Sequence, residues 1–273
     1  MKSTPCILLL LLVACATGKP DRTTFFPKRK QMQPLPTDNT NCWIFLLAGQ
    51  SNMAGRGQIM PSDTLADPRI FALTADNEFV LAKEPLHWYE PERTGLDCGL
   101  SFARAVVKPL PAEIRILLVP TAVGGSSLRQ WLGDSVHRGV RLYSNFLNRL
   151  EAARKSGIVK GILWHQGEAD ANDADIPRYK ERVQELFARF RTAAGDTTLP
   201  VFMGELGSFS KDPAHFARVN AMMHELAATD SRVKVISTGD LHHRGDSLHF
   251  DSKGQRTMGR RFAAAFLQYT GIR

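Results

Sequence analysis

A serine and an aspartate–histidine pair are the groups in this chain whose types and spacing suit nucleophilic catalysis. Ser51 stands two residues after Gly49, where the uncharged apolar run 43–48 ends. Asp246 and His249 are three residues apart near the end of the chain. This spacing can set a carboxylate against one imidazole nitrogen while the other faces outward, as the general base of a serine nucleophile requires. Taken alone, Ser51 fits a helix-capping serine as well.

Two further loops carry groups that could stabilise charge in such a site. Gly124 and Gly125 follow the predicted strand 113–119. A glycine pair lets a backbone N–H approach a ligand closely, as a donor to a developing anion must, although a plain turn explains the same pair. The polar run 165–170 follows another predicted strand, 158–164, and each of its polar groups needs a partner if it is buried.

The elements that must position these groups alternate between strands and helices. Strands are predicted at 43–49, 113–119, 158–164, 199–204 and 233–236, and helices at 99–108, 142–153, 179–191, 213–228 and 252–269. This alternation predicts an α/β fold, a three-layer α/β/α sandwich with a central parallel sheet of about five strands. In open sheets of this kind ligands bind at the carboxyl ends of the strands, where the polar groups above stand. The segment 57–94 contains four prolines and is predicted to be a long functional loop.

Two tryptophans could line a sugar-binding cleft. Trp88 lies in the aromatic stretch 86–89 of the long loop, and Trp131 follows the glycine pair. An indole can stack against a sugar ring, but it can equally pack against the body of the domain. Both interpretations stay open for each residue.

The start of the chain is typical of an export signal. Lys2 precedes the apolar run 7–14, which is too short to span a bilayer. Residues 1–16 are therefore predicted to be a signal peptide. A competing interpretation is a lipoprotein signal that ends before Cys15 and makes this cysteine the site of a lipid anchor. Either way we expect the protein to be exported: secreted, periplasmic or anchored to a membrane.

The predicted leader is followed by a tether and then by one domain. Residues 17–40 contain several prolines and the basic cluster 28–30, and they show no helical or strand periodicity. They are predicted to form a flexible, extended tether. Residues 41–273 are long enough for one domain with a substantial core.

Composition and cysteine usage narrow the possible partners. The formal net charge of +8 is spread evenly, without a basic stripe or zinc-finger spacing, so nucleic acid is not a predicted partner. No metal is expected, because the adjacent His242 and His243 would point in opposite directions on a strand and could not easily share an ion. Cys42 and Cys98 could form a disulfide or remain two buried thiols.

Four motifs in this order resemble the SGNH hydrolase superfamily. More narrowly, they are similar to its branch of sialate O-acetylesterase-like proteins and carbohydrate esterase family six acetylxylan esterases. The resemblance extends from Trp43 to the last predicted helix. The matching stretches are Gly49-Gln50-Ser51-Asn52-Met53, Gly124-Gly125-Ser126, Trp164-His165-Gln166-Gly167-Glu168 and Asp246-Ser247-Leu248-His249-Phe250.

The resemblance implies a role for each matching residue. It makes Ser51 the nucleophile, His249 the general base and Asp246 the residue that orients the base. The oxyanion hole would consist of the Ser51 N–H, a backbone N–H from Gly124 or Gly125, and the side-chain amide of Gln166. Most of the superfamily has asparagine where this chain has Gln166, and glutamine is usual in this branch.

Further residues are candidates for supporting the site or contacting substrate. Glu168 and Asn52 are expected to support the site, with Glu168 holding the loop or the catalytic histidine by hydrogen bonds. His165 is expected to contact substrate, together with Trp88 and Trp131.

The implied activity is a serine carbohydrate esterase that removes O-acetyl groups from a sugar or polysaccharide through an acyl-enzyme, without a metal or organic cofactor. The expected partner is therefore an acetylated carbohydrate. Because the histidine base must be neutral, activity should fall on acidification. The alternatives are a catalytically silent carbohydrate-binding protein on the same scaffold and a lipase- or thioesterase-like hydrolase.

Overall fold

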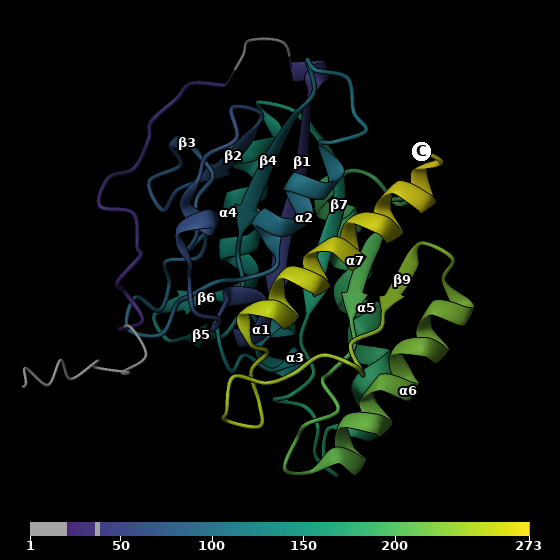
Figure 1. Ribbon diagram of the computed structural model, residues 1–273. Coiled ribbons are helices and arrows are strands. Elements are labelled where there is room, and N and C mark those ends of the chain that lie inside the picture. Colours follow the sequence, from purple (N-terminus) through teal and green to yellow (C-terminus); the bar gives the residue numbers. More distant parts are fainter. Residues whose placement is uncertain (1–20, 36–38, 273) are drawn as a thin grey trace, which may run out of the picture.

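The computed structural model describes residues 21–35 and 39–272, and within them seven strands form one central sheet. The strands are β1 (Cys42–Gly49), β2 (Ile70–Leu73), β3 (Phe79–Leu81), β4 (Arg115–Pro120), β7 (Ile158–His165), β8 (Val201–Gly204) and β9 (Val233–Ile236). Their order is β3-β2-β4-β1-β7-β8-β9, and every neighbouring pair is parallel except β2 and β3. The predicted α/β class with a mostly parallel central sheet is confirmed (Figure 1).

The sheet is two strands wider than the five predicted from the sequence. The additional strands β2 and β3 lie in the segment 57–94, for which the sequence predicts a long loop. They are four and three residues long, so neither shows enough alternation to be recognised. Their conformation depends on partners distant in the chain, since Ile70 and Phe71 pair with residues of β4.

The five predicted helices are present, with ends that differ from the expected ones by a few residues. They are α2 (Gly99–Val106), α4 (Leu142–Arg154), α5 (Tyr179–Ala194), α6 (Pro213–Thr229) and α7 (Ser252–Thr270). Two short helices, α1 (Ser51–Ala54) and α3 (Leu128–Leu132), and the two-stranded hairpin of β5 (Val136–His137) and β6 (Val140–Arg141) occur in the loops. The side chains of Asp212 and Asp251 accept backbone N–H groups at the starts of α6 and α7, which is why these helices begin there.

The sheet has a hydrophobic core on each face, as buried parallel sheets require. Side chains of β1 alternate between the two: Ile44 and Leu46 join one core, and Phe45 and Leu47 join the other. Helices α2 and α7 cover the Phe45 face, where they cross in front of the sheet in Figure 1, and α3, α4, α5 and α6 contribute to the opposite core. The three layers expected from the sequence are therefore present.

The three central strands end at the same edge of the sheet. β4, β1 and β7 are neighbours, and their register pairs Leu47 with Pro120 and Gly49 with His165. Because all three run in the same direction, the loops that follow them meet at one place. These are the loops that carry Ser51, the glycine pair and the polar run 165–170.

The described part of the predicted tether is bound to the domain. Residues 31 and 33 form backbone hydrogen bonds with β3, and an antiparallel bridge links Met32 to Val80. The Arg22 guanidinium donates to the backbone carbonyls of Pro91 and Thr94. Residues 21–35 are therefore not a free tether, because strand pairing that the local sequence cannot reveal fixes them.

The predicted export segment cannot be compared with this fold. The signal peptide over 1–16 and the lipid-anchor candidate Cys15 lie outside the described residues. Among residues 21–35 and 39–272, no helix has the length and apolar character needed to cross a membrane.

The two cysteines of the domain are free thiols. Cys42 and Cys98 are both buried, and they belong to the different cores on the two sides of the sheet. Burial raises the pKa of the Cys42 thiol to about 12, so this thiol stays protonated. Of the two alternatives left open by the sequence, the disulfide is wrong.

Candidate active site

Ser51 stands directly beyond the carboxyl end of the central strand. Gly49 has φ +132°, and a Cβ at this position would lie 2.1 Å from the carbonyl oxygen of His165, so only glycine fits this turn. The Gln50 N–H donates to the same His165 oxygen over 2.9 Å. The chain then enters α1, whose first residue is Ser51. The fold thus fixes the serine backbone between β1 and β7.

A hairpin-like loop between β9 and α7 brings His249 to Ser51. His243 forms an antiparallel bridge with Phe250, and the N–H of Arg244 donates to the carbonyl of His249 over 2.9 Å. His249 Nε2 lies 3.0 Å from Ser51 Oγ, although the two residues are 198 positions apart in the chain. The predicted nucleophile and base are therefore within hydrogen-bonding distance.

Asp246 occupies the other side of the imidazole. Its Oδ2 lies 2.8 Å from His249 Nδ1, and its Oδ1 accepts the His249 backbone N–H over 2.8 Å. Partial burial disfavours the Asp246 charge, but these hydrogen bonds outweigh it and hold the pKa of the carboxyl below its usual value. An ionised carboxylate here favours the tautomer with the proton on Nδ1, which leaves Nε2 free to accept the Ser51 proton.

Asn52 holds the backbone on both sides of His249. Its Nδ2 donates to Leu248 O over 3.1 Å and to Glu168 Oε1 over 2.6 Å, and its Oδ1 accepts the Phe250 N–H over 3.0 Å. Asn52 is almost fully buried, so water competes little for these contacts. The expected supporting residues Asn52 and Glu168 thus contact each other, and Asn52 links the serine turn to the histidine loop.

The glycine loop is anchored by a buried carboxylate, which leaves one glycine N–H for a ligand. The Gly124 N–H donates to Glu90 Oε2 over 2.7 Å, so it is already occupied. A Cβ on Gly124 would lie 2.2 Å from the Arg56 guanidinium, which explains the need for glycine. The Gly125 N–H has no acceptor among the described residues. Of the two predicted donors, only the Gly125 N–H is therefore free among the described residues, and its role in an oxyanion hole stays a prediction.

Glu90 is itself held by two arginines. Arg56 donates to its Oε2 over 2.6 Å, and Arg138, in the turn of the β5–β6 hairpin, contacts its Oε1. Burial opposes ionisation of Glu90, but the arginines and the Gly124 N–H keep its pKa below the usual value. Arg56, Glu90 and Arg138 were not predicted from the sequence. The one local feature that could have pointed to this ion pair is the charge of Arg56, which directly follows the uncharged residues 52–55.

Gln166 does not present its amide to Ser51. Both amide protons are engaged, since Nε2 contacts Ser126 O at 3.2 Å and the carboxylate of Asp170. The side chain has no exposed surface. Asp170, also missed from the sequence, accepts the Leu128 N–H over 2.9 Å as well. In this arrangement Gln166 joins the glycine loop to the loop after β7, and the prediction of an oxyanion donor is wrong.

His165 is a buried structural residue. Its Nε2 pairs with Glu205 O at 2.9 Å, and its Nδ1 lies 3.6 Å from Glu168 Oε1. Burial lowers the pKa of the imidazole, so His165 is neutral near pH 7 and donates from Nε2. Because it has no exposed surface, it cannot contact substrate as expected.

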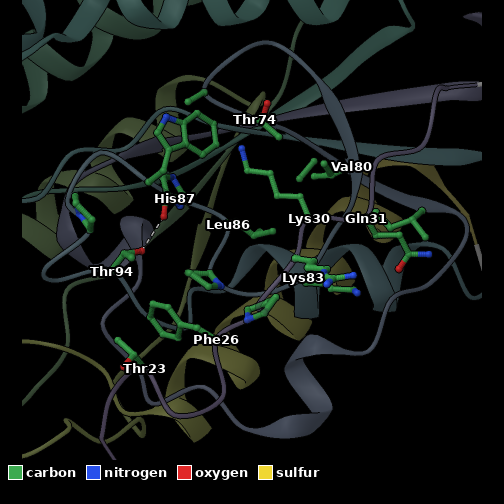
Figure 2. A pocket seen from close by; sticks show the side chains of 18 of the residues that line it. Thr23, Phe26, Lys30, Gln31, Thr74, Val80, Lys83, Leu86, His87 and Thr94 are labelled. Atoms are coloured by element: carbon green, nitrogen blue, oxygen red, sulfur yellow. Dashed lines mark hydrogen bonds between the residues drawn. The ribbon is translucent and has the colours of Figure 1, made fainter.

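Neither predicted tryptophan lies at Ser51. Trp131 has no exposed surface; it packs against Trp164 at 5.6 Å between ring centroids, and its Nε1 donates to Ser126 Oγ over 2.9 Å. Trp88 lines a different pocket, shown in Figure 2, whose lining contains none of Ser51, Asp246 and His249. Burial therefore excludes Trp131 as a substrate contact. For Trp88 the predicted contact with substrate stays a prediction.

A polar pocket of about 480 Å³ adjoins the glycine loop. It is lined by Gly125, Ser127, Arg129, Gln130, Ser135, Ala169 and Asp175. Hydrogen bonds tie two of its sides to the Ser51 turn: Ser126 Oγ donates to Gly49 O over 3.2 Å, and the Ala169 N–H donates to Gln50 Oε1 over 3.2 Å. Hydrogen-bonding groups thus line a space to which Gly125 contributes.

Among the described residues, no group of three or more histidine, cysteine, aspartate or glutamate side chains is placed to hold a metal ion.

Comparisons with known proteins identify the family of this chain. Residues 41–268 match the model of the family described as carbohydrate esterase, sialic acid-specific acetylesterase. A probable carbohydrate esterase from Arabidopsis thaliana is 30% identical over an alignment of 263 residues, and the match covers 88% of this chain and 94% of that protein. A crystal structure of a protein from Arabidopsis thaliana, also 30% identical, has a TM-score of 0.74 and covers 84% of this chain and 98% of its own.

More distant structures share the fold. NanS has a TM-score of 0.70 at 18% identity, covering 88% of this chain and 100% of its own. A carbohydrate acetylesterase from Xanthomonas citri has a TM-score of 0.63 at 20% identity, covering 84% of this chain and 56% of its own. The family match spans the described domain from β1 to α7, so this chain belongs to the carbohydrate esterase family of sialic acid-specific acetylesterases.

Proposed function

We propose that this protein removes O-acetyl groups from a carbohydrate through an acyl-enzyme formed on Ser51. The observation that carries the proposal is the ordered contact of three side chains: Ser51 Oγ lies 3.0 Å from His249 Nε2, and His249 Nδ1 lies 2.8 Å from Asp246. Serine esterases use this order of hydroxyl, imidazole and carboxylate on several unrelated folds. Membership of a carbohydrate acetylesterase family supports the acetylated sugar as substrate.

In the first step, Ser51 Oγ attacks the ester carbonyl carbon while His249 Nε2 takes the hydroxyl proton. The new C–O bond forms as the carbonyl π electrons move onto its oxygen. When this tetrahedral intermediate collapses, the bond to the sugar oxygen breaks and His249 delivers its proton to that oxygen. The products are the free sugar hydroxyl and an acetyl group esterified to Ser51.

Water then reverses the sequence. His249 takes a proton from water, the hydroxide adds to the acetyl carbonyl, and collapse returns the electron pair and the proton to Ser51 Oγ. Acetic acid leaves and ionises. Asp246 keeps its negative charge throughout, so it stabilises the imidazolium that forms in both steps.

Two backbone N–H groups are available for the developing oxyanion. The first N–H groups of a helix have no intrahelical acceptor, and Ser51 is the first residue of α1. The Gly125 N–H is the second donor in this proposal. A preorganised donor of this kind contributes roughly 3 kcal/mol to the transition state.

The polar pocket beside Gly125 is the place we assign to the sugar. Its serine, arginine, glutamine and aspartate side chains can exchange hydrogen bonds with hydroxyl groups. Its lining does not include Ser51, Asp246 or His249, so the assignment rests on Gly125, which lines the pocket and carries the second proposed oxyanion donor. The methyl group of acetate needs little room, so most of the substrate volume lies on the sugar side.

The start of the chain supports a proposed site of action outside the cytoplasm. Lys2 and the apolar run 7–14 are typical of an export signal, and Cys15 is the candidate site of a lipid anchor.

The test compares a Ser51→Ala variant with a Ser62→Ala variant, which changes an exposed serine of η2 (Pro61–Thr64). Both are assayed with p-nitrophenyl acetate, with a series of longer nitrophenyl esters, and for acetate release from acetylated sialic acids and acetylated xylan. We expect Ser51→Ala to lose all turnover and Ser62→Ala to keep it, with acetyl esters preferred.

Three outcomes contradict the proposal. Full activity in Ser51→Ala would exclude the serine mechanism. A preference for long acyl chains would favour a lipase-like hydrolase. Wild-type protein that binds the glycans but releases no acetate would be a carbohydrate-binding protein.

A further inference from the structure

A second pocket, of about 540 Å³, lies between the N-terminal segment and the domain (Figure 2). We call it the N-terminal pocket and define it by Phe26, Lys30, Val80, Lys83, Leu86 and Trp88. Its sides come from residues 22–31, from β2 and β3, and from the loop 83–94. Because its lining excludes Ser51, Asp246 and His249, the proposed esterase chemistry does not account for it.

Two sequence features that the active site leaves unused meet in this pocket. Arg29 and Lys30 belong to the basic cluster 28–30 and line one side. Leu86 and Trp88 belong to the aromatic stretch of the long loop and line another. The pairing of residues 31–33 with β3 fixes the first side against the second. The fold thus brings a positive and an apolar segment from distant parts of the chain to one cavity.

The charge of the lining is positive and largely uncompensated. Four cationic residues line the pocket against a single acidic one, Glu92. Lys30 Nζ lies 3.8 Å from Asp76, but both side chains are mostly exposed, so this ion pair is weak. Arg29 and Lys83 form no ion pair among the described residues. Such a pocket attracts an anion.

The rest of the lining is mainly carbon. Phe26, Val80 and Leu86 contribute apolar side chains, and Figure 2 shows these three together with Lys30 and Lys83 around the same space. Trp88 is held in place, with its ring 5.1 Å from that of Tyr89 and under the Arg149 guanidinium at 5.4 Å. A preformed apolar pocket with a few polar groups is typical of small-molecule sites.

One buried polar atom in this lining lacks a partner. His87 lines the pocket and pairs through Nδ1 with Asp97 at 2.9 Å, while its buried Nε2 has no partner among the described residues. Because this nitrogen is buried, it offers no hydrogen bond to a molecule in the pocket, and His87 contributes only to the shape of the lining.

We infer that the N-terminal pocket binds an amphipathic anion, a carboxylate carried on an alkyl chain. The carboxylate would lie near Lys30 and Lys83, and the chain would pack against Phe26, Leu86 and Trp88. An acidic sugar fits less well, because its many hydroxyl groups need more hydrogen-bonding partners than these mainly apolar sides offer.

The experiment measures binding of dodecanoate by isothermal titration calorimetry, at concentrations at which it does not form micelles. The test variant is Lys30→Glu/Lys83→Glu. The matched control is Lys108→Glu/Lys211→Glu, which makes the same change in net charge at two exposed lysines outside the pocket. We expect dodecanoate affinity to fall at least tenfold in the test variant and to stay within twofold of wild type in the control.

Tryptophan fluorescence tests separately whether dodecanoate binds in the N-terminal pocket. Dodecanoate should change the tryptophan emission of the wild type, and a Trp88→Phe variant should lose this change while calorimetry still detects binding. Thermal unfolding midpoints confirm that each variant is folded.

Three results would overturn the inference. The first is an equal loss of dodecanoate binding in the test and control variants, which would mean that the overall net charge, and not the pocket, determines the affinity. The second is binding of dodecylamine as tight as that of dodecanoate. The third is binding of glucuronate without binding of dodecanoate, which would make the site one for acidic sugars.

Discussion

The carboxylate of Glu90 accepts a 2.7 Å hydrogen bond from the backbone N–H of Gly124 and is paired with the Arg56 guanidinium through the same oxygen. A buried ion pair and the loop beside Ser51 therefore form one unit. The contact also decides which glycine is available, because it consumes the Gly124 N–H and leaves that of Gly125. Substitution of Glu90 should therefore affect both the free energy of unfolding and the turnover rate. A second substitution at Arg56 can show whether the two effects have separate causes.

Glu90→Gln should lower both stability and turnover. The neutral amide leaves Arg56 as a buried, uncompensated charge, which costs about 3 kcal/mol in the free energy of unfolding. The weakened anchor lets the glycine loop move, so we expect kcat for p-nitrophenyl acetate to fall roughly tenfold. Urea unfolding and steady-state kinetics measure the two effects.

A double variant separates these effects. Arg56→Met/Glu90→Leu removes both charges, so stability should largely return, while the Gly124 N–H still lacks its acceptor and turnover should stay low. Recovery of kcat together with stability would show that the loop does not depend on Glu90.

Asn52→Ala should impair catalysis through His249. The substitution removes the hydrogen bonds to Leu248 O and the Phe250 N–H that hold the backbone around the imidazole. We expect kcat to fall about ten- to a hundredfold with little change in KM, because misplacement of a reacting group by about 1 Å costs this much. In a His249→Ala background the same substitution should have no further effect on kcat.

Asn220 provides the matched control for Asn52. Its side chain also holds backbone, accepting the Leu206 N–H over 2.8 Å and donating to Leu206 O over 3.0 Å, and neither bond involves Ser51, Asp246 or His249. Asn220→Ala should lower the unfolding midpoint but leave kcat within about twofold of wild type. Equal losses of kcat in the two variants would mean that Asn52 acts only through stability.

Gln166→Ala should mainly destabilise the protein. Both amide protons are bound to Ser126 O and to Asp170, so the variant leaves a buried carboxylate without one of its donors. Removing a partner from a charged buried group costs about 2 kcal/mol or more. We expect kcat to change less than tenfold. A hundredfold loss of kcat at unchanged stability would instead return Gln166 to the oxyanion hole.

Asp230→Asn should reduce stability in a pH-dependent way. Partial burial opposes the Asp230 charge, but hydrogen bonds from Arg232 and Arg191 lower the pKa of the carboxyl to about 2. A lowered pKa stabilises the fold above the unfolded value of about 4, and this stabilisation disappears as the pH falls toward 2. After allowance for solvent screening, the contribution is about 1–2 kcal/mol.

Urea unfolding of wild type and Asp230→Asn between pH 6 and pH 3 measures this effect. The difference in the free energy of unfolding should be largest at pH 6 and should narrow on acidification. A constant difference across this range would mean that the lost contact is not coupled to ionisation.

Much of the fold was predictable because local sequence determines it. The predicted strand 158–164 corresponds to β7, and the helix 179–191 to α5, since long apolar runs and helical periodicity need no distant partner to be recognised. β2 and β3 were not predictable, because they are short and take their conformation from neighbours in the sheet. The same holds for residues 21–35.

In the candidate site, too, some residues could be predicted from local sequence and others could not. Ser51, Asp246 and His249 were predictable because motif and spacing identify them, and the structure brings them together. The exposure of a side chain, in contrast, could not be predicted from the sequence. Trp131 and His165 look suitable for binding in the sequence, yet both are completely buried, and burial depends on tertiary packing. Glu90 was missed because its contact with Gly124 spans 34 residues.

The pairing of residues 31–33 with β3 has a consequence for handling the protein. β3 is the last strand on its side of the sheet, and this short segment occupies its outer hydrogen-bonding groups. Unprotected edge strands recruit other chains and promote aggregation. Proteolytic removal of residues 21–35 would therefore produce a folded but aggregation-prone fragment. Its self-association should appear before any loss of helix content.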